Sequence, residues 1–294
     1  MLIPDAVRTC VVFVGHETRK GNVEVCGTAF LVGRELKGTE EYAVYCVTAK
    51  HVIDEIKARS GYQVWLRINS ASGAPEWIAT ELHDWLYHPS RELVDVAAMA
   101  FDIDSSPFDL EMHTNRACPL SIAADNEKIT QEAIGIGDEV VLVGLFSQHK
   151  GTKRNIPIVR VGNIAAMPEE PVCSKLGYME AYLVEVRSIG GLSGSPVFVH
   201  LGITRSLDGK LKIGDSRNPK IFLLGLMHGH WDSTDSSSED VIEDSFFKNE
   251  KLNMGIAIVV PMVKILEVLN QDEFKRAEEI KADRWRKAHL PTMD

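Results

Sequence analysis

The stretch GGLSGSPVF at residues 190–198 carries two serines among glycines, and a serine hydroxyl can act as a nucleophile. Serine is a weak nucleophile at neutral pH, so it needs a base to take its proton and a third group to orient that base. It also needs backbone N–H groups aimed at the developing oxyanion, and flanking glycines allow the backbone to bend so that these groups converge. A glycine-rich hairpin turn is the alternative, which the motif alone does not exclude.

Two other segments offer the base and the carboxylate that such a serine requires. His51 lies in YCVTAKHVID, at the end of an apolar strand and the start of a short helix. Asp95 lies in the apolar strand VDVAAMAF, where a buried carboxylate without a partner is costly. Taken singly, His51 is one of ten histidines, and Asp95 could face water from an edge strand. Together with Ser193 they form a candidate Ser-His-Asp triad.

The composition predicts a soluble globular protein of one or two domains, with 294 residues, 45% of them apolar and 25% charged. The net charge of −10 argues against broad binding to nucleic acid or to an anionic membrane, although it leaves a local basic patch open. No run of about 18 apolar residues is present, so no membrane span is expected. The N-terminal MLIPDAVRTCVVFVG lacks the basic start and long apolar stretch of a secretion signal.

The cysteines are odd in number, scattered, and form no CxxC pair of the kind that binds metals. Buried free thiols in a reducing compartment are the simplest interpretation, and they indicate a cytoplasmic location. The five residues are Cys10, Cys26, Cys46, Cys118 and Cys173.

Short apolar segments separated by glycine, asparagine and charged residues predict a mostly β protein with two groups of strands. A polar, proline-broken crossover is expected at 102–135, a short helix at 51–60, and a helical tail from Pro261. An Asp-Gly hairpin signal lies in an insertion at 201–220, and an acidic, serine-rich loop at 231–251. The predicted strands are 7–15, 23–33, 42–49, 62–68, 76–82 and 93–101, then 138–147, 156–167, 181–189, 196–201, 221–229 and 254–260.

With these segments in place, residues 7–270 resemble the trypsin-like serine peptidases of the chymotrypsin fold. GTAFLV followed by VTAKHV is similar to the family's histidine segment, DVAAMAF to its aspartate strand, and GDEVVLVG to the opening of its second barrel. GGLSGSPVF resembles its serine loop, and IFLLGLMHG and MGIAIVVPMVKIL resemble the strands and helix that follow. The bacterial-type branch is the most similar, including the high-temperature-requirement peptidases and the glutamyl endopeptidases.

The resemblance implies two antiparallel six-stranded β-barrels with a C-terminal α-helix and the active site between the barrels. It divides the chain into an N-terminal barrel at 1–115, a C-terminal barrel at 116–270 and a helical extension at 271–294. It implies hydrolysis of a protein or peptide substrate through an acyl-enzyme, without a cofactor. The resemblance makes His51 the base, Asp95 its orienting group and Ser193 the nucleophile. The backbone N–H groups of Gly191 and Ser193 then form the oxyanion hole. Ser195 is a neighbour of the nucleophile and not the nucleophile itself.

Two positions depart from the secreted digestive members of this family. Leu192 replaces the aspartate that pairs with a new N-terminus after zymogen cleavage, so activation of that type is not expected. Val52 replaces a disulfide cysteine, which leaves Cys26 without its usual family partner. The missing disulfide partner, together with the missing secretion signal, favours an intracellular member of the family.

The family resemblance places the primary substrate pocket on both sides of the serine loop. The positively charged or titratable Arg187, His228 and His230 could favour an acidic substrate residue, although glutamyl members carry their histidine where this chain has Met227. HDWLYH (83–88) and HGH (228–230) lack cysteine or carboxylate partners at ligand spacing, so no metal site is expected. The expected pocket residues are Arg187, Ser188, Gly190, Met227, His228 and Gly229.

The sequence leaves three functions open. The first is an active intracellular serine endopeptidase. The second is a catalytically silent peptidase fold that serves as a binding or scaffold module. The third is a conditional peptidase in which the acidic loop 231–251 gates the site until an activating protein partner or a ligand orders it.

Overall fold

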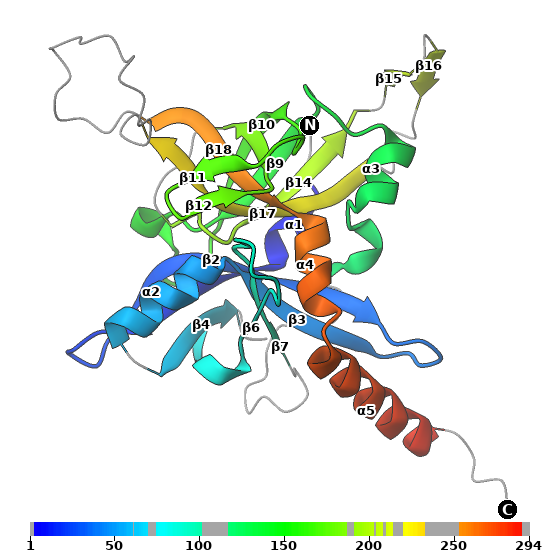
Figure 1. Cartoon of the computed structure of the whole chain (residues 1–294). Helices are drawn as coiled ribbons and strands as arrows, with labels where there is room; N and C mark the ends of the chain where they lie inside the picture. The colour runs from blue at the N-terminus through cyan, green and yellow to red at the C-terminus, as the bar shows by residue number, and fades with distance from the viewer. Residues whose placement is uncertain are drawn as a thin grey trace, which may run out of the picture.

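The computed structural model describes residues 3–60, 62–69, 75–101, 117–186, 191–202, 204–207, 210–213, 220–232 and 253–289 (Figure 1). Its regular structure is mostly β, as the short apolar segments predict. No helix in this described part of the chain is both long enough and apolar enough to cross a membrane.

The N-terminal half is built on an antiparallel sheet with the strand order β5-β4-β1-β2-β3-β7-β6. β8 is added by a short parallel pairing with β2. Val, Ile and aromatic residues dominate these strands, and such side chains pack well on a pleated, buried surface. The strands are β1 (Val11–Glu17), β2 (Val23–Glu35), β3 (Tyr42–Thr48), β4 (Gln63–Asn69), β5 (Pro75–Glu81), β6 (Leu86–Tyr87), β7 (Ala97–Ala100) and β8 (Cys118–Pro119).

This sheet differs from the predicted six-stranded barrel in two respects. It has eight strands, and its hydrogen-bonded path does not close between β5 and β6 among the described residues. The 3₁₀ turn η1 (Leu82–Asp84) ends the β5 ladder, and β6 is only two residues long. Too little strand therefore remains at this corner to complete a ladder.

The C-terminal half is a closed six-stranded barrel in the order β10-β13-β18-β17-β14-β9, as predicted. β17 carries bulges between Met227 and Gly229 and between His230 and Asp232, so its side chains change face near the serine loop. The strands are β9 (Glu139–Gly144), β10 (Ile158–Ala166), β13 (Tyr182–Glu185), β14 (Pro196–Leu201), β17 (Lys220–Asp232) and β18 (Asn253–Pro261).

Two hairpins and several short helical elements complete the described chain. β15 (Thr204–Leu207) and β16 (Lys210–Ile213) form the hairpin that the Asp-Gly pair predicts. The sequence did not predict the hairpin of β11 (Val172–Ser174) and β12 (Gly177–Met179), nor the helix α3 (Asn126–Glu132) inside the expected crossover. The other short elements are α1 (Asp5–Thr9), α2 (Lys50–Ser60), η3 (Leu120–Ile122) and η4 (Ser147–His149).

Two helices at the C-terminal end return the chain from the second barrel to the first sheet (Figure 1). α4 (Met262–Leu269) buries the apolar side of its helix, as the spacing of MVKILEVL predicts. α5 (Asp272–His289) is mostly charged but buries Phe274, whose ring packs edge-on against Tyr45 of β3 with centroids 5.1 Å apart. The C-terminal helix therefore ties the two halves together.

Candidate active site

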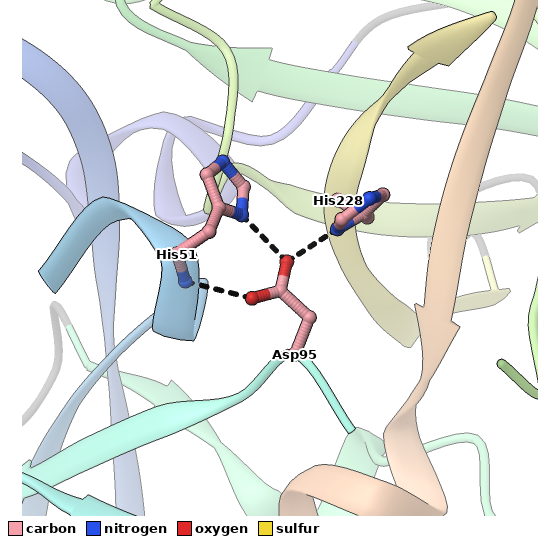
Figure 2. A group of neighbouring side chains, drawn as sticks. All are labelled: His51, Asp95 and His228. Atoms are coloured by element: carbon pink, nitrogen blue, oxygen red, sulfur yellow. Dashed lines mark hydrogen bonds and ion pairs between the residues drawn. The ribbon is translucent and has the colours of Figure 1, made fainter. Parts of the chain in front are cut away.

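Asp95 lies in the extended stretch that precedes β7, two residues before the strand in which the sequence had placed it. Its side chain is only 1% exposed, which excludes the alternative of a water-facing edge position. Its Oδ1 atom accepts a hydrogen bond from the backbone N–H of His51 at 2.8 Å, and its Oδ2 atom lies 2.7 Å from the ring Nδ1 of His51 (Figure 2). These bonds offset the cost of burying the carboxylate.

His51 lies where the sequence predicts, just after β3 and in the first turn of α2. The backbone bond to Asp95 holds the start of the helix, while the ring bond fixes the orientation of the imidazole. The side chain of His51 is 19% exposed, so the ring stays accessible from outside. This arrangement resembles the base and orienting carboxylate of a catalytic triad.

A second histidine binds the same carboxylate oxygen. His228 of β17 places its Nδ1 atom 2.5 Å from Oδ2 of Asp95 (Figure 2). The two imidazole rings lie edge to face, with centroids 5.2 Å apart and planes at 76°. Asp95 therefore joins one histidine from each half of the molecule.

The pKa values of Asp95 and His51 are shifted by these contacts. Burial alone would raise the pKa of Asp95, but the hydrogen bonds from His228 and His51 outweigh it, so the net pKa is well below the ordinary 3.8. For His51, burial would lower the pKa, but the hydrogen bond to Asp95 and nearby negative charges raise it above 6.5. Because an ionised carboxylate only accepts hydrogen bonds, both histidines donate to it from a protonated Nδ1.

The serine loop is held against the first sheet by Thr28 of β2. Thr28 donates its hydroxyl to the backbone oxygen of Gly191 at 2.7 Å and its backbone N–H to the oxygen of Ser193 at 3.0 Å. The same hydroxyl accepts a bond from the N–H of Leu145 at 2.9 Å. Thr28 thus connects the two halves beside the candidate nucleophile.

Two further residues of the loop explain its sequence. Gly194 has a φ of +81°, and a Cβ there would lie 2.2 Å from the backbone oxygen of Thr28, so only glycine fits. Leu192 is completely buried in the core of the second barrel. An apolar anchor therefore occupies the position where related secreted enzymes use a buried ion pair.

The two serines of the motif have different surroundings. Ser195 is completely buried, and its hydroxyl has no hydrogen-bond partner among the described residues. Ser193 is partly exposed, and its Oγ atom donates to the backbone oxygen of His228 at 3.1 Å. Within the described chain the hydroxyl of Ser193 is not bonded to the His51 ring. Only Ser193 is accessible enough to meet a substrate.

The backbone around Ser193 also has groups that could bind an oxyanion. The N–H groups of Gly191 and Ser193 donate to no acceptor in the part of the chain that the structure describes. Gly191 has a φ of +96°, a left-handed conformation that favours glycine. Both N–H groups are therefore without a protein acceptor in the described chain, as the predicted oxyanion hole requires.

The residues predicted to form the substrate pocket differ in burial and in contacts. The Met227 side chain is buried in the core of the second barrel, whereas Gly229 has open space on the side where a Cβ would stand. The His228 ring is bound to Asp95, which removes it from the group proposed to favour an acidic substrate residue. Arg187, Ser188 and Gly190 lie outside the described residues.

A cavity of about 490 Å³ reaches Asp95 and is rich in carboxylates. Lys264 is the one basic residue in its lining and pairs with Glu180 at 3.2 Å. The remaining acidic residues give the cavity a negative character that favours cationic groups. Its acidic residues are Glu92, Asp95, Glu169, Glu170 and Glu180.

Sequence reasoning missed the role of Thr28 and the bond between His228 and Asp95. Thr28 belongs to the quoted GTAFLV motif, but a threonine in an apolar strand carries no signal that its hydroxyl bonds the serine loop. His228 lies 133 residues from Asp95 in the chain. Only the register of β17 brings its ring to the carboxylate.

Comparison with solved structures identifies the fold. The MamO protease domain from Magnetospirillum magneticum is similar with a TM-score of 0.50 and 12% identity, over 90% of this chain and 98% of that chain. HL collagenase is similar with a TM-score of 0.47 and 10% identity, over 90% of this chain and 93% of that chain. Human heparin binding protein is similar with a TM-score of 0.38 and 12% identity, over 76% of this chain and 89% of that chain. No family model and no curated protein matches the sequence. The chain has the chymotrypsin fold, so the resemblance to trypsin-like peptidases is confirmed at the level of the fold.

Proposed function

We propose that this protein is a serine endopeptidase that cleaves peptide bonds with Ser193, His51 and Asp95. The observation that carries the proposal is the buried Asp95 carboxylate, which holds His51 through both its backbone N–H and its ring. An ordinary surface ion pair does not require one carboxylate to accept hydrogen bonds from both the backbone and the ring of the same histidine. The chymotrypsin fold supports the proposal, because it is the fold of the peptidases that the sequence resembles.

In the first half of the proposed reaction, the Nε2 atom of His51 takes the proton of the Ser193 hydroxyl as Oγ attacks the substrate carbonyl carbon. The new C–O bond forms while the carbonyl π electrons move onto the oxygen, which the N–H groups of Gly191 and Ser193 stabilise. Asp95 stabilises the imidazolium that results. His51 then gives its proton to the amine nitrogen as the C–N bond breaks, which leaves an acyl-enzyme.

In the second half, water replaces the departed amine. His51 takes a proton from the water as its oxygen attacks the acyl carbon, and the same backbone N–H groups stabilise the second oxyanion. The proton returns to Oγ of Ser193 as the ester bond breaks, which restores the hydroxyl and releases the acid product. Atoms and charges balance without a cofactor.

The present bond of Ser193 raises a second candidate, a peptidase that is active only with a partner or ligand. Its hydroxyl is bonded to the backbone oxygen of His228 and must leave that acceptor to bond the base. The change replaces one neutral hydrogen bond, worth about 1 kcal/mol, with another. Because so small a cost does not require an activator, we propose that the chain has basal activity.

We further propose a protein or peptide substrate with basic groups, since the cavity beside Asp95 is rich in carboxylates. The acidic preference suggested by Arg187, His228 and His230 loses one supporting residue, because the His228 ring is already bonded. The five cysteines are free, which supports an intracellular, reducing location. A silent scaffold is less favoured because the two candidate oxyanion donors are not bonded within the described chain.

Labelling with a fluorophosphonate probe tests the proposal. The probe is expected to label the wild-type chain at one site, and Ser193→Ala is expected to abolish labelling. Ser195→Ala is the matched control and is expected to keep most of the labelling, since this buried hydroxyl lacks a partner in the described structure. Undiminished labelling of Ser193→Ala would exclude Ser193 as the nucleophile, and no labelling of folded wild type would favour the scaffold.

A further inference from the structure

We propose that His51, Asp95 and His228 form a binding site for one transition-metal ion of the Zn²⁺ type, and that the bound ion turns the active site off. Each residue offers one ligand atom, and these atoms lie within 4.8 Å of one another. Two imidazole nitrogens and a carboxylate oxygen are ligands that zinc prefers, and three protein ligands with one open position form a known type of zinc site.

The geometry requires only a small change to accept the ion. The two Nδ1 atoms now lie 2.7 and 2.5 Å from Oδ2 of Asp95, because protons bridge them. Around a tetrahedral ion about 2.0–2.1 Å from each ligand, neighbouring ligand atoms lie about 3.3 Å apart. Each Nδ1 atom must therefore move away from Oδ2 by roughly 0.6–0.8 Å, and the two imidazole nitrogens, now within 4.8 Å of each other, must lie about 3.3 Å apart.

The surroundings supply a favourable field. Asp95 belongs to the lining of a cavity of about 490 Å³, although its own side chain is only 1% exposed. Glu92, Glu169 and Glu170 line the same cavity, while its one lysine is paired with Glu180. A cavity with this excess of negative charge raises the local concentration of divalent cations.

Binding would change the proton positions on both rings. A metal ion needs the lone pair of Nδ1, so each neutral ring must carry its proton on Nε2 instead, with no net change in ring charge. The Nε2 atom of His51 is then unable to take the proton of Ser193. The inhibitory effect rests on the proposed peptidase function, whereas the metal site itself does not.

Titration with Co²⁺ tests the site directly, because the cobalt ion absorbs visible light when its coordination is tetrahedral. The full-length Ser193→Ala chain is expected to bind one Co²⁺ with that absorption, and Zn²⁺ is expected to displace it. His228→Gln should reduce the affinity at least tenfold. His88→Gln is the matched control, because His88 also pairs with a carboxylate, Glu267, at 2.5 Å, and it should bind as the parent does.

A thermal melt without metal first checks that each variant is folded. If His228→Gln does not fold, Asp95→Asn replaces it, since it also removes a ligand. Zn²⁺ is expected to raise the melting temperature of the parent chain, because the ion joins elements of both halves. Lack of the tetrahedral absorption, or its full retention in the folded ligand variant, would overturn the site.

The effect on the active site is measured separately by fluorophosphonate labelling of Ser193. Zn²⁺ is expected to slow labelling of wild type and of His88→Gln at least tenfold, and a chelator should restore it. Labelling that Zn²⁺ leaves unchanged or accelerates in a chain that binds Co²⁺ would overturn the inhibitory role. If the chain binds Co²⁺ but the probe never labels Ser193, the metal site stands, and both the peptidase function and its inhibition by metal are refuted.

Discussion

At Asp95, burial and hydrogen bonding shift the pKa of one carboxyl group in opposite directions. Burial favours the neutral acid, whereas donors from His51 and His228 favour the anion and win. The anion in turn raises the pKa of His51, although burial of that ring opposes the rise. A single buried charge thus sets the protonation of the candidate base.

The pH dependence of activity follows from the raised pKa of His51. The base must be neutral, so kcat/KM should rise with pH through a value above the ordinary 6.5. Asp95→Asn removes the main group that raises this pKa, so the acid limb should move to lower pH. Its kcat should also fall by about 10⁴-fold, because the Asn amide can donate to Nδ1 of His51 and so leave the ring proton on Nε2, where the base must be free.

The measurement is kcat/KM against pH on a peptide substrate, with a chelator present in every sample. His88→Gln serves as the control and should keep the wild-type limb. An acid limb of Asp95→Asn identical to that of wild type would show that a group other than His51 controls the rate.

At the scale of elements, the serine loop is held from both halves of the molecule. Thr28 of β2 bonds the loop backbone at Gly191 and Ser193, while Leu192 points into the core of the second barrel. A buried leucine needs no cleaved N-terminus to complete it. The loop can therefore be set by folding alone.

Leu192→Ala tests this anchor. Deleting a fully buried leucine side chain should lower the free energy of unfolding by about 2–5 kcal/mol and slow probe labelling of Ser193. Leu176→Ala is the matched control, since Leu176 is 52% exposed at the β11–β12 turn, and should change stability by less than about 0.5 kcal/mol. Urea unfolding gives both values, and equal effects of the two substitutions would argue against the anchor.

At the scale of the whole molecule, α5 fastens the C-terminal end of the chain to the first sheet. Glu278 of this helix accepts hydrogen bonds from Tyr45 and, at 2.8 Å, from Arg34. Phe274 is 3% exposed and packs on the ring of Tyr45. A helix that sequence patterning presents as mostly charged is thus a structural part of the fold.

Phe274→Ala should destabilise the protein by about 3–5 kcal/mol, because it removes a buried aromatic ring from this contact. Ile280→Ala, on the exposed side of the same helix at 54% exposure, is expected to cost much less. Thermal or urea unfolding distinguishes the two. Wild-type stability in folded Phe274→Ala would mean that α5 contributes little to the fold.

The reactivity of the cysteine thiols tests whether the whole chain is free of disulfides. Cys173 is the exposed cysteine, and burial raises the pKa of Cys10 and of Cys26 to about 12, so their thiolates are scarce at neutral pH. A thiol reagent should therefore react quickly with Cys173 in the native protein and with all five cysteines after denaturation without reductant. Fewer than five thiols would reveal a disulfide.

The mostly β class, most strand positions and the Ser-His-Asp candidates could be read from local patterns. Valine-rich runs, an Asp-Gly turn and a glycine-rich serine loop each express a backbone preference that neighbouring residues decide. The short helices α1 and α3 and the β11–β12 hairpin were missed because their segments are short. Propensity over so few residues is weak against tertiary contacts.

The sequence by itself determined the order of the strands along the chain and the residue types able to do chemistry, because both depend on local side-chain pattern. Only the tertiary structure decided that Thr28 holds the serine loop and that His228 shares the carboxylate of Asp95 with His51. Those contacts depend on how two separate β-structures pack and on the bulges that set the register of β17. A second histidine on the carboxylate of Asp95 is therefore a property of the folded chain.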